Sequence, residues 1–219
     1  MSRPGRAPTP EKSTTGRSKA TRLRLLRGYF AALAAFAPAL AERHALRIFC
    51  TPGPRRRHEV RGIAGVEAVP LEVRSGGERL RCWSYGEGPT VLCVHGWGGS
   101  AGDLAGVAEA LVPAGFRVVV FDFQGHGFST GRRANLVRLV GALQAVAHEI
   151  TFSRSGTVQP LHAVVAHSFG VAAATLALRE GLLARALVLM APAAHPRTWT
   201  SRRRRWGFRA ISGTAWSAV

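Results

Sequence analysis

The chain has 219 residues, of which 47% are hydrophobic and 19% are charged. This length and composition exclude a wholly disordered protein and allow one domain with a buried core plus extensions. The formal net charge of +18 would favour a nucleic-acid-binding protein only if that charge lay on the folded body.

Most of the positive charge lies toward the two ends of the sequence. Residues 1–61 hold 14 Lys and Arg against 3 acidic residues, and residues 196–219 hold 6 Arg and no acidic residue. Residues 62–195 hold 10 basic and 9 acidic residues and are close to neutral. We therefore predict solvated basic ends and no specific nucleic-acid partner, with weak contact between the N-terminal region and a membrane surface as an alternative.

The first 61 residues are expected to lie outside the main domain. Residues 1–21 are polar and without periodicity, which predicts a disordered basic tail. Apolar residues then recur at a 4-3-4-3-4 spacing, which predicts an amphipathic helix over 22–49 that Pro38 kinks. Pro, Gly and Arg follow up to residue 61 and indicate a charged linker. The spaced residues of the helix are Leu26, Phe30, Leu33, Ala37, Leu40 and His44.

Residues 28–41 allow a second interpretation. They are uncharged, follow three arginines and end in a small-x-small pattern, as in a signal peptide. They are shorter than the roughly 20 residues of a membrane span. The helical spacing favours the amphipathic helix over the signal peptide. The three cysteines, Cys50, Cys82 and Cys93, have no metal-ligand or CxxC spacing. A cytoplasmic location is the working prediction, with export or membrane association through 22–49 as the alternative.

From residue 66 onward, short apolar runs alternate with amphipathic helical patterns. The first two runs are joined by a Ser-Gly-Gly turn, which predicts an antiparallel hairpin. Strands separated by helices predict parallel pairing with right-handed crossovers. The sequence therefore predicts an α/β fold, a mostly parallel sheet with helices on both faces that is entered by the hairpin. The strands are expected at 66–73, 79–86, 90–95, 117–122, 161–166 and 186–191, and the helices near 104–111, 136–150 and 169–180.

The strongest local signal is the segment 164–173, VVAHSFGVAA, in which an apolar strand runs through small-x-Ser-x-Gly into a helix. A nucleophilic serine at such a turn sits in a strained conformation that projects its hydroxyl from the edge of the sheet. Ser168 is the predicted nucleophile, flanked by His167. The positions two residues before and after it need small side chains, which Ala166, standing where Gly is usual, and Gly170 provide. An ordinary helix-capping serine is the competing interpretation.

A second glycine-rich segment, VLCVHGWGGS at 91–100, follows the strand expected beside that of Ser168. Gly96 and Gly98 let backbone amides point toward a reacting carbonyl, as an oxyanion hole requires. The predicted donors are the N–H groups of Trp97 and Phe169, the latter opening a helix whose positive end favours an anion. His95 is predicted to brace this loop rather than to transfer protons.

A third segment, FDFQGHGFSTG at 121–131, completes the set. With HGWGGS, D-x-x-G-H-G-x-S and A-H-S-x-G in this order, the chain resembles the α/β-hydrolase superfamily of serine hydrolases over residues 66–192. The resemblance implies that Asp122 and His126 organise a loop and are not triad members. The following Gly131-Arg132-Arg133 resembles the lysophospholipase and monoacylglycerol-lipase branch. Residues 62–195 are thus expected to form the hydrolase core.

The resemblance also implies a triad in the order nucleophile, acid, His, which this sequence does not supply. The 28 residues after Ala191 contain no Asp or Glu, and His195 is the only His among them. We expect His195 to be a surface turn residue, and residues 196–219 to be a basic tail that begins an incomplete lid. The chain is accordingly expected to be C-terminally truncated, and its missing terminal strands would leave the run 186–191 as a bare apolar edge.

Three functions remain open from the sequence. The first is a serine hydrolase that acts on a small-molecule carboxylic ester, with a lipid or acylglycerol as the narrower option, and with activity impaired by the absent acid and His. The second is an inactive truncated product or a pseudoenzyme. The third is a protein that associates with membranes or polyanions through its basic ends. No metal cluster or phosphate-binding loop is recognisable, so no cofactor is predicted.

Overall fold

The computed structural model describes residues 14–63, 65–152 and 159–192, with side chains described from residue 21 onward. The chain divides into two compact units, one up to Phe49 and one from Cys50 onward. The predictions for residues 1–13, for His195 and for the basic tail 196–219 lie outside the described residues.

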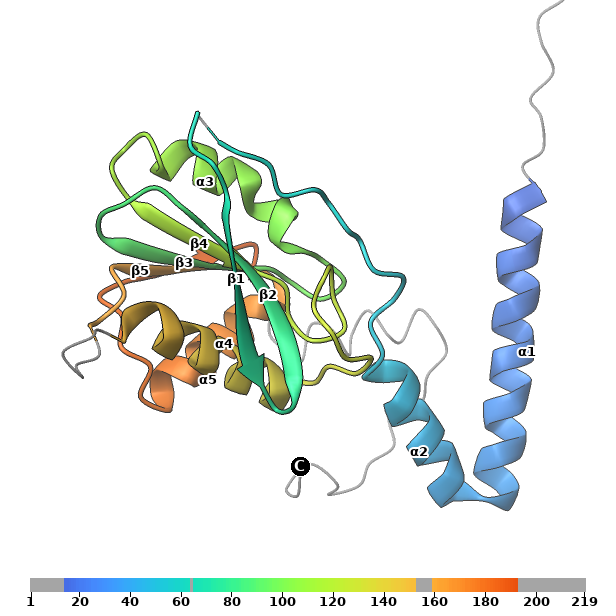
Figure 1. Cartoon of the computed structure of the whole chain (residues 1–219). Coiled ribbons are helices and arrows are strands. Elements are labelled where there is room, and N and C mark those ends of the chain that lie inside the picture. Colours follow the sequence, from blue (N-terminus) through green and yellow to red (C-terminus); the bar gives the residue numbers. More distant parts are fainter. Residues whose placement is uncertain (1–13, 64, 153–158, 193–219) are drawn as a thin grey trace, which may run out of the picture. The chain divides into compact units, whose positions relative to one another are not determined.

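The first unit contains two helices, α1 (Thr14–Phe36) and α2 (Pro38–Phe49), where one kinked helix was expected (Figure 1). The N–H of Ala37 still donates to the Leu33 carbonyl, and the N–H of Leu40 donates to the Ala37 carbonyl at 3.0 Å. Pro38 lacks an N–H and suits the first position of a helix, so it ends one helix and opens the next. The two helices contact each other through Tyr29, whose hydroxyl is hydrogen-bonded to the His44 imidazole.

The predicted start of the first helix at residue 22 was placed too late. The helical backbone begins at Thr14, so residues 14–21 do not belong to a disordered tail as predicted. Once an apolar segment has nucleated a helix, each further residue adds one hydrogen bond at small cost. Lys, Arg and Ala in this stretch are good helix formers, which explains the extension through a segment without periodicity.

The second unit is built on a six-stranded sheet with the order β1-β2-β4-β3-β5-β6. β1 and β2 form the predicted hairpin, β2 pairs antiparallel with β4, and β4, β3, β5 and β6 are parallel. The predicted fold class is therefore confirmed. The strands are β1 (Val69–Ser75), β2 (Glu78–Tyr85), β3 (Thr90–Val94), β4 (Arg117–Phe121), β5 (Ala163–His167) and β6 (Leu187–Met190).

Helices cover both faces of this sheet (Figure 1). One face packs against α4 (Leu136–Thr151) and α5 (Phe169–Arg179), and the other against a short 3-10 helix, η1 (Ala101–Leu104), and α3 (Ala105–Leu111). The central strands alternate strictly between the two cores, since Leu92 and Val94 face the first and Val91 and Cys93 the second. Both sets are buried, which explains why these strands read as continuous apolar runs.

Residues 50–61, predicted to be a linker apart from the main domain, instead pack against the second unit. Pro52 is buried, and the Cys50 carbonyl accepts a hydrogen bond from the Ala134 N–H at 2.8 Å. His58 pairs with Asp103 at 2.7 Å. The linker prediction failed because Pro, Gly and Arg mark irregular backbone but do not reveal what that backbone contacts.

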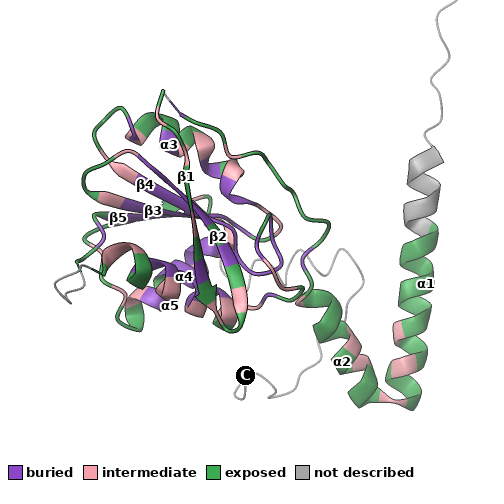
Figure 2. Cartoon of the chain, in the orientation of Figure 1, coloured by how far each residue is buried: buried purple, intermediate pink, exposed green. Residues whose placement is uncertain are grey.

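β6 forms one edge of the described sheet, and its apolar side chains are poorly covered. Val188 is 47% exposed and Leu189 is 51% exposed, whereas the central strands are almost wholly buried (Figure 2). Among the described residues, β6 pairs only with β5.

No helix in the described part of the chain combines the length and the apolar character needed to cross a bilayer.

The core of the second unit provides a first prediction. Leu143 on α4 is fully buried, so Leu143→Ala should lower the free energy of unfolding by about 2–5 kcal/mol through lost burial and a residual cavity. Val137 on the same helix is 62% exposed, and Val137→Ala should change it by less than about 0.5 kcal/mol. Urea denaturation of both variants measures the difference, and equal effects would contradict this assignment of the core.

Candidate active site

Ser168 occupies a sharp turn between β5 and α5. Its backbone has φ 52° and ψ −118°, a conformation that a non-glycine residue adopts only at a cost of about 1–3 kcal/mol. Its N–H donates to the Met190 carbonyl on the neighbouring strand at 2.9 Å. Strain of this kind persists only where the surroundings impose it, and it is the conformation that a nucleophile elbow requires.

The close approach of the β3 loop explains why Gly170 must be small. A Cβ on Gly170 would lie 2.5 Å from the His95 carbonyl oxygen and 3.0 Å from the Val94 carbonyl oxygen. Ala166, on the other side of the turn, is fully buried in the core beneath α4 and α5, which accommodates its methyl group. The turn therefore tolerates Ala at one predicted position and excludes it at the other.

The segment after β3 reaches the same turn from the adjacent strand. β3 pairs with β5 in parallel, as predicted, so both strands end at the same edge of the sheet. A Cβ on Gly96 would lie 2.9 Å from the Ser168 Cβ and 3.2 Å from the His167 carbonyl oxygen. The backbone of this loop thus passes directly over the serine, at the place where backbone donors for an oxyanion are needed.

His95 is enclosed, and both of its ring nitrogens are used. Nδ1 donates to the Gly96 carbonyl at 2.7 Å, and Nε2 accepts from the Phe123 N–H at 3.1 Å. These partners fix a neutral tautomer, and burial lowers the pKa of His95 to about 3. The imidazole ties the β3 loop to the β4 loop and has no free nitrogen with which to accept a proton from Ser168.

His126 is held in a similar way. Its Nδ1 donates to the Gln124 carbonyl at 2.9 Å, and its Nε2 accepts from the Gly98 N–H at 3.1 Å. Burial lowers the pKa of His126, and its backbone partners keep the neutral form in place. The ring also contacts Trp97, with the two centroids 5.6 Å apart. His126 therefore braces the glycine loop at Gly98, next to the His95 ring, whose centroid lies 5.1 Å away.

Asp122 gathers backbone donors from two loops. One carboxylate oxygen accepts from the Ala101 N–H and the other from the Phe128 N–H, both at 2.7 Å. Burial raises the pKa of this carboxyl, while the two hydrogen bonds act in the opposite direction. Both oxygens are occupied by backbone, so the carboxylate positions loops rather than a catalytic imidazole.

Trp97 and Phe169, whose N–H groups are the predicted oxyanion donors, come together at the mouth of the turn. Their rings meet edge to face, with centroids 5.7 Å apart. Phe169 is the first residue of α5, where a backbone N–H has no intrahelical acceptor. The structure thus brings the Trp97 and Phe169 side chains together, and the role of their N–H groups as oxyanion donors stays a prediction.

Sequence reasoning missed one residue that supports the site. The Arg55 guanidinium donates to the Ser129 carbonyl at 2.8 Å and also to the Gly131 carbonyl. Ser129 in turn donates its hydroxyl to the Asp122 carbonyl at 2.6 Å. Arg55 therefore anchors the loop that carries Asp122 and His126. In the sequence, Arg55 is one of three consecutive arginines, and such a run is also expected where all the side chains are solvated.

A general base for Ser168 is not found among the described residues. The Ser168 hydroxyl makes no hydrogen bond to them. Glu180, the one acidic residue after Ser168, lies at the far end of α5, about 18 Å along the helix, and accepts from the Gln144 amide. His95, His126 and Asp122 are engaged elsewhere, and His195 is outside the described residues.

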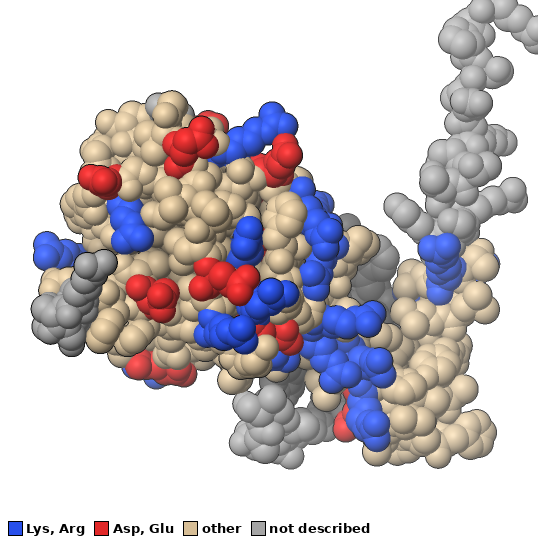
Figure 3. Space-filling view, in the orientation of Figure 1, with Lys and Arg blue, Asp and Glu red and all other residues tan. Residues whose placement is uncertain are grey.

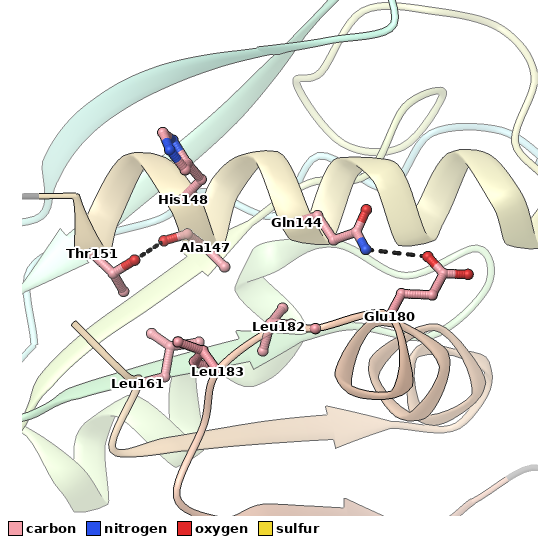
Figure 4. A pocket seen from close by; sticks show the side chains of 9 residues that line it. Gln144, Ala147, His148, Thr151, Leu161, Glu180, Leu182 and Leu183 are labelled. Carbon is pink, nitrogen blue, oxygen red and sulfur yellow. Dashed lines mark hydrogen bonds between the residues drawn. The ribbon is translucent and has the colours of Figure 1, made fainter. Parts of the chain in front are cut away.

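A hollow on the surface lies away from this turn (Figure 4). It is lined by the C-terminal half of α4, by residues 180–183 directly after α5 and by Leu161, which precedes β5, whereas Ser168 follows β5. The hollow therefore opens at the opposite edge of the sheet and is not the candidate active site.

Comparison with protein families and curated proteins agrees with this geometry. The family model described as serine aminopeptidase, S33, matches residues 88–216. The human serine hydrolase-like protein is 29% identical over 109 residues, which cover 48% of this chain and 50% of that protein. Human serine hydrolase-like protein 2 has the same identity, with 32% of its length covered. The chain thus spans half or less of the curated relatives it matches.

Solved structures support the same fold. An esterase of Pyrococcus furiosus superimposes with a TM-score of 0.60 at 21% identity, covering 72% of this chain and 63% of the esterase. Epoxide hydrolase A of Mycobacterium thermoresistibile superimposes with a TM-score of 0.51 at 24% identity, covering 64% of this chain and 46% of that enzyme. At these identities the likeness extends to the fold alone.

The clearance around the turn can be tested with two glycines, each within a helix. Gly170→Ala should lower the free energy of unfolding by about 1–3 kcal/mol, because the added methyl group meets the His95 carbonyl. Gly141→Ala in α4 has open space and should raise it by about 0.5–1 kcal/mol through helix propensity. Thermal or urea unfolding measures both, and stabilisation by Gly170→Ala would show that the loops do not approach as described.

The buried imidazoles predict acid sensitivity. The folded-state pKa of His95 is about 3, far below the ordinary 6.5, so below pH 6.5 the unfolded chain binds a proton that the folded chain excludes. Stability conferred by this group is complete above pH 6.5 and falls toward pH 3 by up to about 1.4 kcal/mol per pH unit. When the free energy of unfolding is measured by urea denaturation at several pH values, His95→Gln should reduce its dependence on pH between pH 3 and pH 6.5. His162→Gln, at an exposed position, should leave this dependence unchanged.

Proposed function

The chain belongs to the serine aminopeptidase S33 family of α/β-hydrolases, and from this premise we propose that it is a serine hydrolase acting on a carboxylic ester with Ser168 as nucleophile. The observation that carries the proposal is the strained turn at Ser168 and the close approach of the loop that contains Gly96. A Cβ on Gly96 would lie only 2.9 Å from the Ser168 Cβ. A helix-capping serine requires neither this strain nor this approach.

The proposed reaction is acyl transfer in two steps. The Ser168 oxygen attacks the acyl carbon of the ester, and the alkoxide leaves with the proton that the hydroxyl gives up. Water then attacks the acyl-serine and releases the carboxylic acid. Both steps place negative charge on the carbonyl oxygen, which the N–H groups of Trp97 and Phe169 would stabilise.

The positive end of α5 supports the same role. Phe169 opens this helix, so its N–H and the partial positive charge of the helix point at the nucleophile's position. His95 and His126 hold the glycine loop at two points, the Gly96 carbonyl and the Gly98 N–H. An oxyanion hole built in this way would be rigid before substrate binds, which is the condition for it to lower the barrier.

We further propose that proton transfer is impaired in the 219-residue chain. The His95 and His126 imidazoles and the Asp122 carboxylate already bind backbone groups, and Ser168 has no hydrogen-bonded base among the described residues. Loss of the histidine alone costs a serine protease about six orders of magnitude in turnover. Oxyanion stabilisation and binding would leave about 10³–10⁴-fold over water.

The proposal that the substrate is an ester rests on the absence of a general base beside Ser168 among the described residues. An ester has a better leaving group than an amide, so it is the acyl substrate that a nucleophile without a base attacks more readily. The esterase among the structural neighbours supports this choice. A lipid or acylglycerol ester is the narrower proposal, for which the Gly131-Arg132-Arg133 segment is the support.

Active-site labelling with a fluorophosphonate tests both parts of the proposal. Alone, the chain should label slowly or not at all, whereas added imidazole, acting as an external base, should raise the Ser168 adduct at least about tenfold. Mass spectrometry of the adduct measures it. Ser168→Ala should remain unlabelled, and Ser75→Ala in the hairpin turn should behave as the parent chain.

The outcomes separate the possibilities. Rapid Ser168 labelling without imidazole would retain the hydrolase and refute the impairment. No Ser168 adduct even with imidazole, in a chain shown to be folded, would refute the nucleophile and favour a pseudoenzyme.

A further inference from the structure

The two-helix unit leaves a large apolar surface uncovered. Along α1, Leu25, Tyr29, Ala32 and Phe36 follow a 4-3-4 spacing and so lie on one face of the helix. Leu25 is 69% exposed and Phe36 is 90% exposed. None of the described side chains between residues 21 and 49 is fully buried. Such a surface costs free energy in water unless something covers it.

The second helix extends this apolar surface. Leu46 and Ile48 on α2 are both more than half exposed. The helices contact each other through Tyr29 and His44, whose rings stack with centroids 5.9 Å apart. Of the exposed apolar side chains named above, Tyr29 alone takes part in this ring contact, so polar residues at Leu25, Phe36 and Ile48 would leave it in place.

Arginine side chains accompany the apolar ones on both helices. From residue 21 to residue 49 the sequence has five arginines and one glutamate, and Arg22, Arg24 and Arg43 are exposed. In Figure 3 the surface of the two helices is largely tan and interrupted by blue, with little red. Residues 62–195 of the second unit, in contrast, hold 10 basic and 9 acidic residues, so there most basic side chains have acidic counterparts in number.

We propose that the hairpin of α1 and α2 is a docking surface for an anionic lipid bilayer. The exposed apolar side chains would enter the boundary between headgroups and acyl chains, as in other amphipathic interfacial helices. The arginines would extend to the lipid phosphates while their aliphatic stems cover apolar surface. The proposal is independent of the catalytic role of Ser168.

The combination of the two side-chain types selects this occupant. A nucleic acid would use the arginines but leaves Leu25, Phe36 and Ile48 without a partner. A second copy of the hairpin would cover the apolar side chains but would bring arginines of like charge together. A bilayer with anionic headgroups satisfies both sets at once.

Vesicle co-sedimentation of the full chain tests the proposal. The chain should bind vesicles of equal parts phosphatidylcholine and phosphatidylglycerol much more tightly than phosphatidylcholine alone. Binding should weaken strongly at about 1 M salt, where charge screening acts within about 3 Å.

Two triple variants separate the contributions. Arg22→Gln, Arg24→Gln and Arg43→Gln together should weaken binding about 100-fold at low salt, since each basic residue near such a surface contributes about 1 kcal/mol. Leu25→Gln, Phe36→Gln and Ile48→Gln should weaken it at least as much, because glutamine keeps helix propensity but cannot enter the acyl region. Circular dichroism checks that both variants remain helical.

Matched controls carry the same changes on the second unit. Arg74→Gln, Arg179→Gln and Arg185→Gln remove exposed arginines there, and Val69→Gln, Val137→Gln and Leu183→Gln remove exposed apolar side chains. Both controls should bind as the parent chain does.

Three results would overturn the proposal. One is the absence of vesicle binding. Another is binding that the apolar variant retains in full, which would indicate a general polyanion site. The third is a concentration-dependent dimer in analytical ultracentrifugation that the apolar variant abolishes while vesicles do not bind, which would indicate a second copy as the occupant.

Discussion

The candidate site depends on the contact between two backbone segments at the carboxyl edge of the sheet. Parallel pairing of β3 with β5 brings the loop after His95 over the turn at Ser168, and the separation leaves no room for a Cβ on Gly96 or Gly170. The strained φ of Ser168 is sustained by the strand and helix on either side and by the hydrogen bond from its N–H to β6. Without this approach, the serine would be an ordinary residue at the start of a helix.

A set of buried polar residues maintains the approach. His95, His126 and Asp122 are each almost fully buried, and each binds backbone groups of two or more loops. Burial of a polar group is tolerated only when its hydrogen bonds are complete, so these residues act as braces rather than as proton carriers. Arg55 adds a further brace from the segment that precedes the sheet, by binding carbonyls of the Asp122 loop.

The two units differ in how far they bury their side chains. The second unit buries both faces of its sheet, and its buried His95, His126 and Asp122 side chains are hydrogen-bonded, whereas Ser100 Oγ and Gln124 Oε1 are buried without a partner among the described residues. The first unit is a pair of helices without a fully buried side chain among those described, and its apolar surface remains available for a partner.

The sequence by itself determined the fold class, the six strands and the turn that holds Ser168, because continuous apolar runs, helical spacing and a small-x-Ser-x-Gly pattern are local properties. It also predicted that β3 would lie beside β5. Only the tertiary structure decided that residues 50–61 pack on the second unit, that Arg55 supports the site, and that every nitrogen of His95 and His126 is occupied. The contacts of Arg55, and those that join His95 and His126 to a second loop, link residues at least 28 positions apart, and no local pattern encodes which partner a polar side chain meets.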